Sequence, residues 1–184
     1  MSSTYLIALG SNRRHQLYGA PPGVVRAAQA ECAALGTVTA RSPVFATPAM
    51  GAAQRSFANA ALVLESELAP PSLLAALKRM EREFGRRRGQ RWGDRVLDLD
   101  IIVWSGGVWS SGAWKSASLT IPHPAFAKRA FVLDPARTIA PDWRDPVSGL
   151  TLGHLHARLT RPRPLLRGAP LLLMRGAKAI GVDP

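Results

Sequence analysis

The segment RWGDRVLDLDIIVW at residues 91–104 constrains the fold of this chain more than any other. Apolar residues recur at every second position from Leu97 to Val103, which predicts a β-strand. Side chains two residues apart share a face of a strand, so Asp98 and Asp100 should project together, with Cα atoms roughly 6.5 Å apart. Two carboxylates about 6 Å apart repel by roughly 2–3 kcal/mol at an effective dielectric near 20. The pair therefore needs basic neighbours or a hard cation such as Mg²⁺.

A solvated face of an amphipathic strand is the alternative explanation of these two aspartates, since alternation always places polar residues on one side. Two observations favour a functional site. Aspartate is depleted in strands, and residues that conflict with local propensity tend to occur at functional sites. The densest positive charge of the chain lies just before or within this segment, in Arg86, Arg87, Arg88, Arg91 and Arg95. Carboxylates suited to Mg²⁺ beside arginines suited to phosphate oxygens predict a nucleoside triphosphate site.

Composition bounds the class of protein. At 184 residues the chain is most simply one domain with a sizeable core. Its hydrophobic content of 47% is ordinary, but its net charge of +12 is not. This charge implies an anionic partner, which could be nucleic acid, a membrane surface or a phosphorylated small molecule. The single cysteine, Cys32, excludes an internal disulfide, and its Ala-rich helical surroundings favour a packed rather than a reactive thiol.

The N-terminal residues MSSTYLIALGSN contain five consecutive apolar residues without a basic region before them, so we expect no signal peptide. No apolar run approaches the length of a membrane span. We therefore expect a soluble, cytoplasmic protein without a membrane partner, and a monomer.

Apolar periodicity and the positions of proline and glycine predict the order of the elements. They are a strand at 4–9, a helix at 21–35, strands at 38–44 and 57–64, and a helix at 70–84. With the aspartate strand the order becomes βαββαβ. This is the ferredoxin-like α+β plan, in which two helices pack on one face of an antiparallel sheet.

Two of these elements have predicted faces. Alternation places Phe57, Asn59, Ala61 and Val63 on one face of the third strand. The second helix carries an apolar face formed by Leu73, Leu74, Leu77, Met80 and Phe84.

The part of the chain beyond residue 104 is predicted in less detail. We expect a glycine turn, an edge strand near 108–109, and a proline-rich loop at 119–129 that enters a short helix. The chain to about residue 159 should then pack beside the sheet. Residues 1–160 form one domain in this interpretation, and residues 161–184 form a Pro/Arg-rich C-terminal extension, partly mobile or wrapped on the surface.

Four motifs resemble, in the same order, those of the 6-hydroxymethyl-7,8-dihydropterin pyrophosphokinase family of folate biosynthesis. They are YLIALGSN at 5–12, FATPAMG at 45–51 with FANAA at 57–61, RWGDRVLDLDII at 91–102, and IPHPAFAKRAFVLDP at 121–135. The resemblance covers about residues 4–160. It implies a ferredoxin-like core that binds two Mg²⁺ ions, ATP and a pterin, and a transfer of the β,γ-pyrophosphoryl group of ATP to the pterin hydroxymethyl oxygen with release of AMP.

The resemblance also assigns roles for the nucleotide and the metal. Asp98 and Asp100 would hold both Mg²⁺ ions, and Arg86 and Arg95 would act with them in catalysis. His123 would donate a hydrogen bond to the nucleotide phosphates, and we do not assign it as a general base. The implied ATP-binding residues are Arg86, Arg88, Trp92, Arg95, Ile101, His123 and Arg129.

The pterin is a flat heteroaromatic ring that needs a stacking slot and a few hydrogen bonds. By resemblance, Phe57 and Phe131 form the slot, and Asn59 reads the pterin edge. Trp92 closes over the site. The other implied pterin contacts are Thr47, Pro48, Met50 and Asp98. Glu81 matches a position that is often acidic in the family and receives no role.

Two rival interpretations remain open at this point. A βαββαβ sheet with a charge of +12 could bind RNA, but such a module carries exposed aromatic residues on its central strands. The segments YLIAL and FANAALVL hold one aromatic residue each, so we expect no nucleic-acid partner. The other rival is a non-catalytic interaction domain in which the LDLD sequence is structural.

Overall fold

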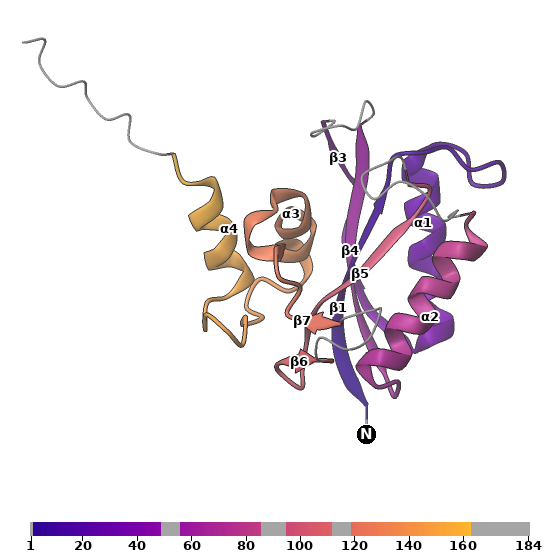
Figure 1. Ribbon diagram of the computed structural model, residues 1–184. Helices are drawn as coiled ribbons and strands as arrows, with labels where there is room; N and C mark the ends of the chain where they lie inside the picture. The colour runs from indigo at the N-terminus through magenta and orange to yellow at the C-terminus, as the bar shows by residue number, and fades with distance from the viewer. Residues whose placement is uncertain (1, 49–55, 86–94, 112–118, 163–184) are drawn as a thin grey trace, which may run out of the picture.

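One five-stranded antiparallel sheet forms the centre of the computed structural model, which describes residues 2–48, 56–85, 95–111 and 119–162 (Figure 1). Its strands lie in the order β2-β4-β1-β5, and β3 also pairs with β4. The strands are β1 Ser3–Ser11, β2 Thr37–Arg41, β3 Phe45–Thr47, β4 Phe57–Ser66 and β5 Asp98–Trp104. The α-helices are α1 Pro21–Glu31, α2 Pro70–Glu83, α3 Ala130–Ile139 and α4 Leu152–Thr160. The predicted βαββαβ order and antiparallel sheet are thus confirmed.

The predicted strand at 38–44 is wrong as a single element, because β2 and β3 are separate strands. Pro43 has no N–H to donate to a sheet, so the chain interrupts its pairing with β4 there. Ser42 maintains the contact at the break. Its N–H donates to the Ala61 carbonyl oxygen at 2.9 Å, and its hydroxyl oxygen accepts the Ala61 N–H at 2.8 Å.

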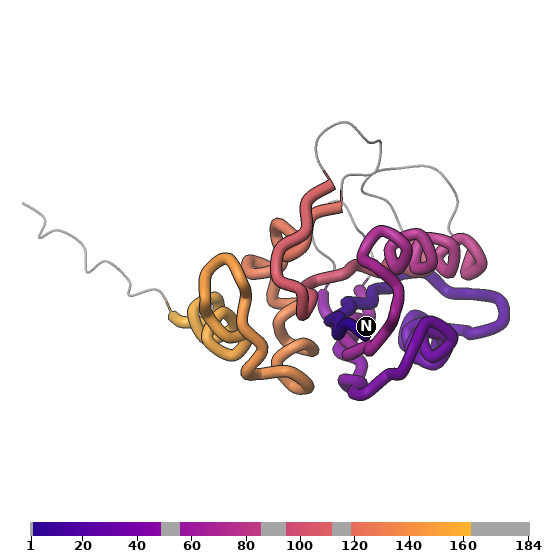
Figure 2. The backbone as a smooth tube through the Cα atoms, turned by 90° about the horizontal axis from the view of Figure 1, so that it is seen from below, coloured from indigo at the N-terminus to yellow at the C-terminus, as the bar shows by residue number. Residues whose placement is uncertain are grey.

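Helices α1 and α2 cover one face of the sheet (Figure 2). Both begin with proline, at Pro21 and Pro70, because the fixed φ and missing N–H of proline suit a first turn. The 3₁₀ turn Cys32–Leu35 extends α1, so the predicted helix at 21–35 is confirmed in extent. The buried residues of the predicted apolar face of α2 include Leu73, Leu77, Met80 and Phe84.

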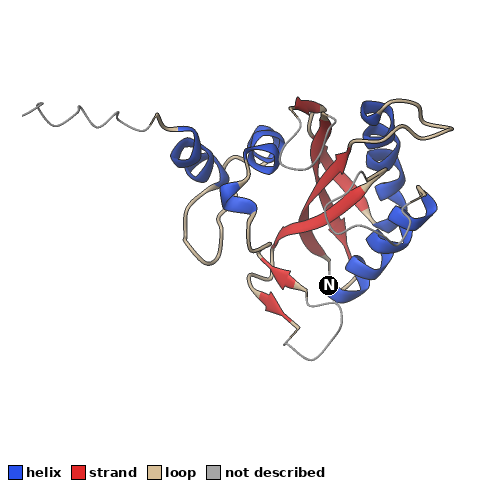
Figure 3. Ribbon diagram, turned by 45° about the horizontal axis from the view of Figure 1, so that its top comes forward, coloured by secondary structure: helices blue, strands red, loops and turns tan. Residues whose placement is uncertain are grey.

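Helix α3 lies on the other face, and α4 packs against α3 on the side away from the sheet (Figures 1 and 3). In this second core Leu6 and Val63 of the sheet pack with Leu133 of α3 and Leu152 of α4. The segment expected beside the sheet therefore covers part of its second face. The predicted alternation of the third strand is confirmed, since Ala61 and Val63 belong to this second core.

Strand β5 differs from its prediction in two ways. It begins at Asp98, and the part of the predicted strand at 91–94 lies outside the described residues. A register shift opposite Leu6 and Ile7 leaves Ile102 as an extra residue, a β-bulge. Ile102 and Val103 therefore both pack in the second core, and the predicted alternation through Val103 is wrong.

A short hairpin-like sheet follows β5. Strand β6 Trp109–Ser110 pairs with β7 Thr120–Ile121. A strand therefore lies near residue 109 as expected, but in a separate two-stranded sheet and not at the edge of the main sheet. The 3₁₀ turn η2 Phe126–Lys128 then leads directly into α3. Among the helices of the described ranges, none has the length and apolar character needed to span a membrane.

Candidate active site

The floor of the candidate site is a row of residues across three neighbouring strands. Asn59 of β4 lies opposite Gly10 of β1, and Gly10 lies opposite Asp98 of β5. Directly opposed residues share a face of an antiparallel sheet, so Asn59 and Asp98 lie on the same face with a glycine between them. A Cβ atom at Gly10 would lie 3.3 Å from Asn59 Oδ1, so a larger residue would crowd the amide.

The next row repeats this arrangement with Asp100. It lies opposite Ala8, which lies opposite Ala61. Ala8 and Gly10 are only half-buried although β1 is a central strand, whereas Leu6 further along is fully buried in the second core. The second face of the sheet is therefore covered at one end and accessible at the other, where the two aspartates lie.

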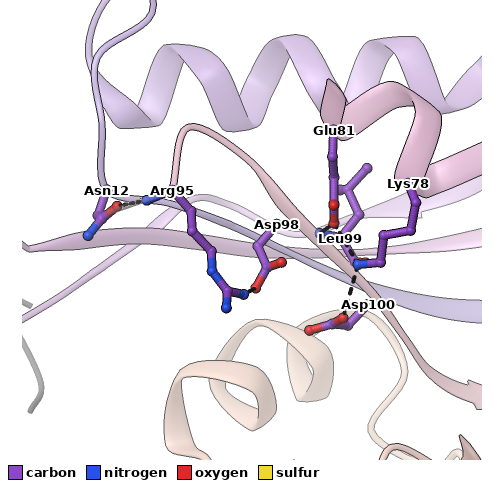
Figure 4. Close-up of polar contacts among 7 residues, drawn as sticks. All are labelled: Asn12, Lys78, Glu81, Arg95, Asp98, Leu99 and Asp100. Atoms are coloured by element: carbon purple, nitrogen blue, oxygen red, sulfur yellow. Dashed lines mark hydrogen bonds and ion pairs between the residues drawn. The ribbon is translucent and has the colours of Figure 1, made fainter. Parts of the chain in front are cut away.

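The two carboxylates project from the same side of β5, as predicted, on the side of α3 (Figure 4). Asp98 Oδ2 accepts a hydrogen bond from Arg95 Nη1 at 2.5 Å. Asp100 Oδ1 lies 3.5 Å from Lys78 Nζ. The side chains of Asp98 and Asp100 are 25% and 36% exposed. Basic neighbours thus compensate the pair, and both carboxylates remain partly accessible to a ligand.

The peptide between the two aspartates is held from the opposite side by α2 (Figure 4). Glu81 Oε1 accepts the Leu99 N–H at 2.7 Å, and Lys78 Nζ donates to the Leu99 carbonyl oxygen at 2.7 Å. Lys78 and Glu81 also form an ion pair at 2.6 Å. Only 1% of the Glu81 side chain is exposed.

Arg95 is anchored through its backbone. Its N–H donates to Asn12 Oδ1 at 2.6 Å, and the Asn12 N–H donates to the Arg95 carbonyl oxygen at 3.1 Å. The loop that follows β1 therefore sets the position from which Arg95 reaches Asp98.

His123 is attached to the outer edge of β5, where its N–H donates to the Ile102 carbonyl oxygen at 2.9 Å. Burial lowers the pKa of His123, the nearby Asp100 carboxylate partly opposes that effect, and Arg129 lowers the pKa further. Its Nδ1 accepts the Ala125 N–H at 3.3 Å. The neutral ring therefore carries its proton on Nε2, which suits the predicted role as a hydrogen-bond donor.

The predicted pterin residues fall into two groups. Strand pairing places Thr47 opposite Phe57, and Asn59 Nδ2 donates to Thr47 Oγ1 at 2.7 Å. Phe131 lies in the first turn of α3, with the Arg129 guanidinium carbon 5.7 Å from its ring centroid. Helix α3 contacts β3 and β4, so the two groups belong to adjoining elements.

The structure leaves several predicted site residues without a place in this arrangement. Arg86, Arg88, Trp92 and Met50 lie outside the described residues. Pro48 is exposed directly after β3. The side chain of Ile101 packs in the core beneath α1 and α2, away from the carboxylates.

The donor atoms of the site fit magnesium. Within the described ranges no group of three or more His, Cys, Asp or Glu side chains is arranged to hold a metal ion. Mg²⁺ does not require such a cage, since it is usually bound by one or two carboxylates together with substrate phosphates and water. Asp98 and Asp100 match that donor set.

A separate groove of about 630 Å³ lies between α1 and α2, on the other side of the sheet. Its lining includes Tyr18, Glu31, Met80 and Phe84. None of the predicted site residues that the structure describes lines this groove, so it is distinct from the site formed by Asn59, Asp98 and Asp100.

Comparison with known proteins decides the family. Residues 6–141 match the family model described as 7,8-dihydro-6-hydroxymethylpterin-pyrophosphokinase, HPPK. The chain belongs to the HPPK family. The resemblance seen in the sequence motifs is thus confirmed.

Two relatives of this HPPK-family chain carry the name 2-amino-4-hydroxy-6-hydroxymethyldihydropteridine pyrophosphokinase. The one from Synechocystis sp. is 44% identical over 104 residues, which are 56% of this chain and 51% of that protein. The one from Pseudomonas aeruginosa is 37% identical over 144 residues, which are 76% of this chain and 82% of that protein. The matched region thus spans about half the length of the Synechocystis relative.

Solved structures support the HPPK fold. Wild-type HPPK-DHPS of Plasmodium falciparum with pteroate has a TM-score of 0.69 to this chain at 12% identity. The match covers 86% of this chain and 44% of that one. At this identity the likeness concerns the fold, and it agrees with the predicted ferredoxin-like class.

Sequence reasoning missed two residues that contact the predicted site of this HPPK-family chain, Asn12 and Lys78. Asn12 ends the quoted motif YLIALGSN, so its position was visible in the sequence although its contact with Arg95 was not. Lys78 precedes Glu81 by three residues on α2, a spacing that places both on one side of a helix.

Proposed function

We propose that this chain transfers the β,γ-pyrophosphoryl group of ATP to the hydroxymethyl oxygen of 6-hydroxymethyl-7,8-dihydropterin in folate biosynthesis, releasing AMP. The observation that carries the proposal is the row of Asn59, Gly10 and Asp98 across three strands. It sets an amide suited to the edge of a flat heterocycle near a carboxylate suited to metal-bound phosphate. The family match and the names of the relatives support the same reaction.

Asp98 and Asp100 are the proposed ligands of two Mg²⁺ ions. When bound, such ions neutralise phosphate charge and orient the transferring group. Their partly exposed carboxylates and their shared direction on β5 support this assignment. Arg95 is proposed to act beside them on the phosphate oxygens, where a planar guanidinium binds two oxygens at once.

The nucleotide in this proposal lies between β5 and the segment that joins β7 to α3. His123 donates from its neutral ring, and Arg129 supplies positive charge. The remaining proposed ATP contacts are Arg86, Arg88, Trp92 and Ile101, the last through its backbone because its side chain is in the opposite core.

The pterin is proposed to lie over the small residues Ala8 and Gly10. Asn59 reads its amide-like edge with Thr47 and the residues that follow, Pro48 and Met50. Phe57 and Phe131 enclose its ring, and Trp92 covers it. The hydrogen bond from Asn59 to Thr47 supports this arrangement, because it fixes the orientation of the amide before a ligand binds.

The reaction requires in-line positioning rather than a covalent intermediate on the protein. The hydroxymethyl oxygen bonds to the β-phosphorus, the bond between that phosphorus and the α,β-bridging oxygen breaks, and the hydroxyl proton is released. The chain contributes by orienting both substrates and by providing countercharge where negative charge develops.

Isosteric substitution of the carboxylates tests the proposal. We expect Asp98→Asn and Asp100→Asn to lower turnover by on the order of 10²-fold or more, since each removes a charge from the site where phosphate is held. The measurement is AMP formed from ATP, Mg²⁺ and the hydroxymethyl pterin, separated by chromatography.

Asp142→Asn is the matched control, because Asp142 is an exposed aspartate between α3 and α4. It should turn over like the parent. Parent-like turnover in Asp98→Asn and Asp100→Asn, with the fold intact, would reject the assignment of these residues.

A further inference from the structure

Strand β5 lies at the edge of the sheet, with β1 as its neighbour on one side. The backbone groups on the open side of an edge strand need other partners when they are buried. At Leu99 these partners come from α2, since Glu81 accepts the N–H and Lys78 donates to the carbonyl oxygen, each at 2.7 Å. Two side chains of α2 thus make, at the single residue Leu99, the hydrogen bonds that a further strand would otherwise make.

Leu99 is the residue between Asp98 and Asp100. Its own side chain is fully buried under α1 and α2, so its peptide groups and side chain are both held. Fixing this residue fixes the directions in which the two flanking aspartates leave the strand. Lys78 adds a direct contact, because its Nζ lies 3.5 Å from Asp100 Oδ1.

The burial of Glu81 indicates that this arrangement is specific. Its side chain is 1% exposed, and a buried carboxylate is costly unless it is paired and hydrogen-bonded. Glu81 is paired with the Lys78 ammonium at 2.6 Å and accepts a hydrogen bond from the Leu99 N–H. Apolar residues at positions 78 and 81 would cover the strand as well, but they could not satisfy the peptide groups of Leu99.

We propose that Lys78 and Glu81 form a positioning pair that aligns Asp98 and Asp100 for divalent metal. The pair acts through the Leu99 peptide, and Lys78 also holds Asp100. This inference rests on the proposed metal role of the two aspartates. Partners that orient metal ligands typically contribute 10–100-fold to metal affinity, so we expect an effect of roughly tenfold here.

The test compares charge-neutral double variants. Lys78→Met/Glu81→Leu removes both partners of Leu99 without changing the net charge. The matched control is Arg79→Met/Glu83→Leu, an exposed pair of opposite charges on the same helix that lines the α1–α2 groove. Lys78→Met/Glu81→Gln restores only an acceptor for the Leu99 N–H.

Two measurements other than turnover distinguish positioning from general stability. Amide hydrogen exchange of Leu99, followed by NMR without ligands, should be at least about tenfold faster in Lys78→Met/Glu81→Leu and close to the parent in Lys78→Met/Glu81→Gln. Mn²⁺ affinity, measured by electron paramagnetic resonance with α,β-methylene-ATP present, should fall roughly tenfold in the first variant and by an intermediate amount in the second. The control should match the parent in both measurements.

The outcomes separate this inference from the proposed function. A folded Lys78→Met/Glu81→Leu variant with parent-like Leu99 exchange and Mn²⁺ affinity would overturn the positioning role. If that variant does not fold, Lys78→Met/Glu81→Gln decides, and Mn²⁺ affinity equal to that of the Arg79/Glu83 control would overturn it. Asp100→Asn in the same Mn²⁺ assay tests the metal role alone, since parent-like affinity there would reject the proposed metal site.

Discussion

Asn12 joins the loop after β1 to the residue that precedes β5. It is 1% exposed and exchanges two backbone-anchored hydrogen bonds with Arg95. Because Arg95 in turn contacts Asp98, a single buried amide connects the first strand to the charged part of the candidate site.

Substitution of this amide should be costly. Asn12→Ala leaves the Arg95 N–H without its acceptor, so we expect the free energy of unfolding to fall by about 1–3 kcal/mol. Urea denaturation of the variant and the parent measures the difference. Asn12→Asp keeps an acceptor for the Arg95 N–H and should lose less unfolding free energy. Equal losses in the two variants would show that this hydrogen bond is not the cause.

The ionisation of His123 should make the free energy of unfolding depend on pH. Burial lowers its pKa below the ordinary 6.5, so the folded state binds this proton less readily than the unfolded chain. The resulting stability is present above pH 6.5 and is lost as pH falls toward the pKa of the folded state. Between pH 7 and pH 5 the parent should therefore lose more unfolding free energy than His123→Gln, measured by urea denaturation. An NMR titration that places the pKa at or above 6.5 would contradict this prediction.

Among the elements, apolar periodicity and the positions of proline and glycine predicted the order of the helices and strands. Asp98 and Asp100 were placed on one face because strict alternation holds between Leu97 and Ile101. The bulge at Ile102 could not be seen, because a strand buried on both faces has an unbroken apolar run and so no period to shift. The break between β2 and β3 could have been predicted from Pro43, but apolar periodicity alone joined the two strands into one.

The candidate site was predicted in the same uneven way. The family motifs pointed to residues within single segments, and the structure brings Thr47 to Asn59, Arg95 to Asp98, and Arg129 to Phe131. Contacts between segments, such as that of Lys78 with Leu99, depend on tertiary packing and carry no local signal. The roles of the site residues remain predictions.

The junction between the 3₁₀ turn Cys32–Leu35 and β2 should be sensitive to substitution of its glycine, Gly36. Gly36 has φ of 153°, and a Cβ atom there would lie 2.1 Å from the Glu65 carbonyl oxygen. Since this neighbour is backbone in β4, Gly36→Ala should destabilise the fold by about 3 kcal/mol or more. Thermal or urea unfolding measures the change.

Gly149→Ala is the control for backbone strain without a clash. It has φ of 70° and no heavy atom within 4 Å of the added Cβ. A cost of about 1–2 kcal/mol is expected there. Equal costs at the two positions would show that conformation alone, and not the approach to β4, explains the glycine at 36.

The whole molecule is a sheet with helices on both faces and a net charge of +12 (Figures 1 and 2). The proposed function accounts for this charge through an anionic substrate, and the RNA-binding rival is weakened because Tyr5 of β1 is fully buried and donates to the Leu68 carbonyl oxygen. The division of the chain into a domain at 1–160 and an extension at 161–184 stays a prediction, and so does the monomeric state.

Salt dependence tests the role of this charge. Raising the ionic strength from about 0.05 to 0.5 M shortens the Debye length to a few ångströms, so the KM for ATP should rise several-fold. The KM for the uncharged pterin should change little, because its proposed contacts are stacking and neutral hydrogen bonds. Steady-state kinetics at several salt concentrations provides the measurement, and an equal rise in both constants would contradict the electrostatic explanation.

The second face of the sheet is covered at only one end, and this should affect how the protein loses activity on heating. Arg129 and Phe131 depend on the second core for their positions, whereas Asn59, Asp98 and Asp100 sit on strands that the first core also supports. Loosening α3 would separate these two groups while the backbone of the sheet stayed paired. Inactivation should then precede global melting, and the gap between the two temperatures would report how firmly α3 is attached.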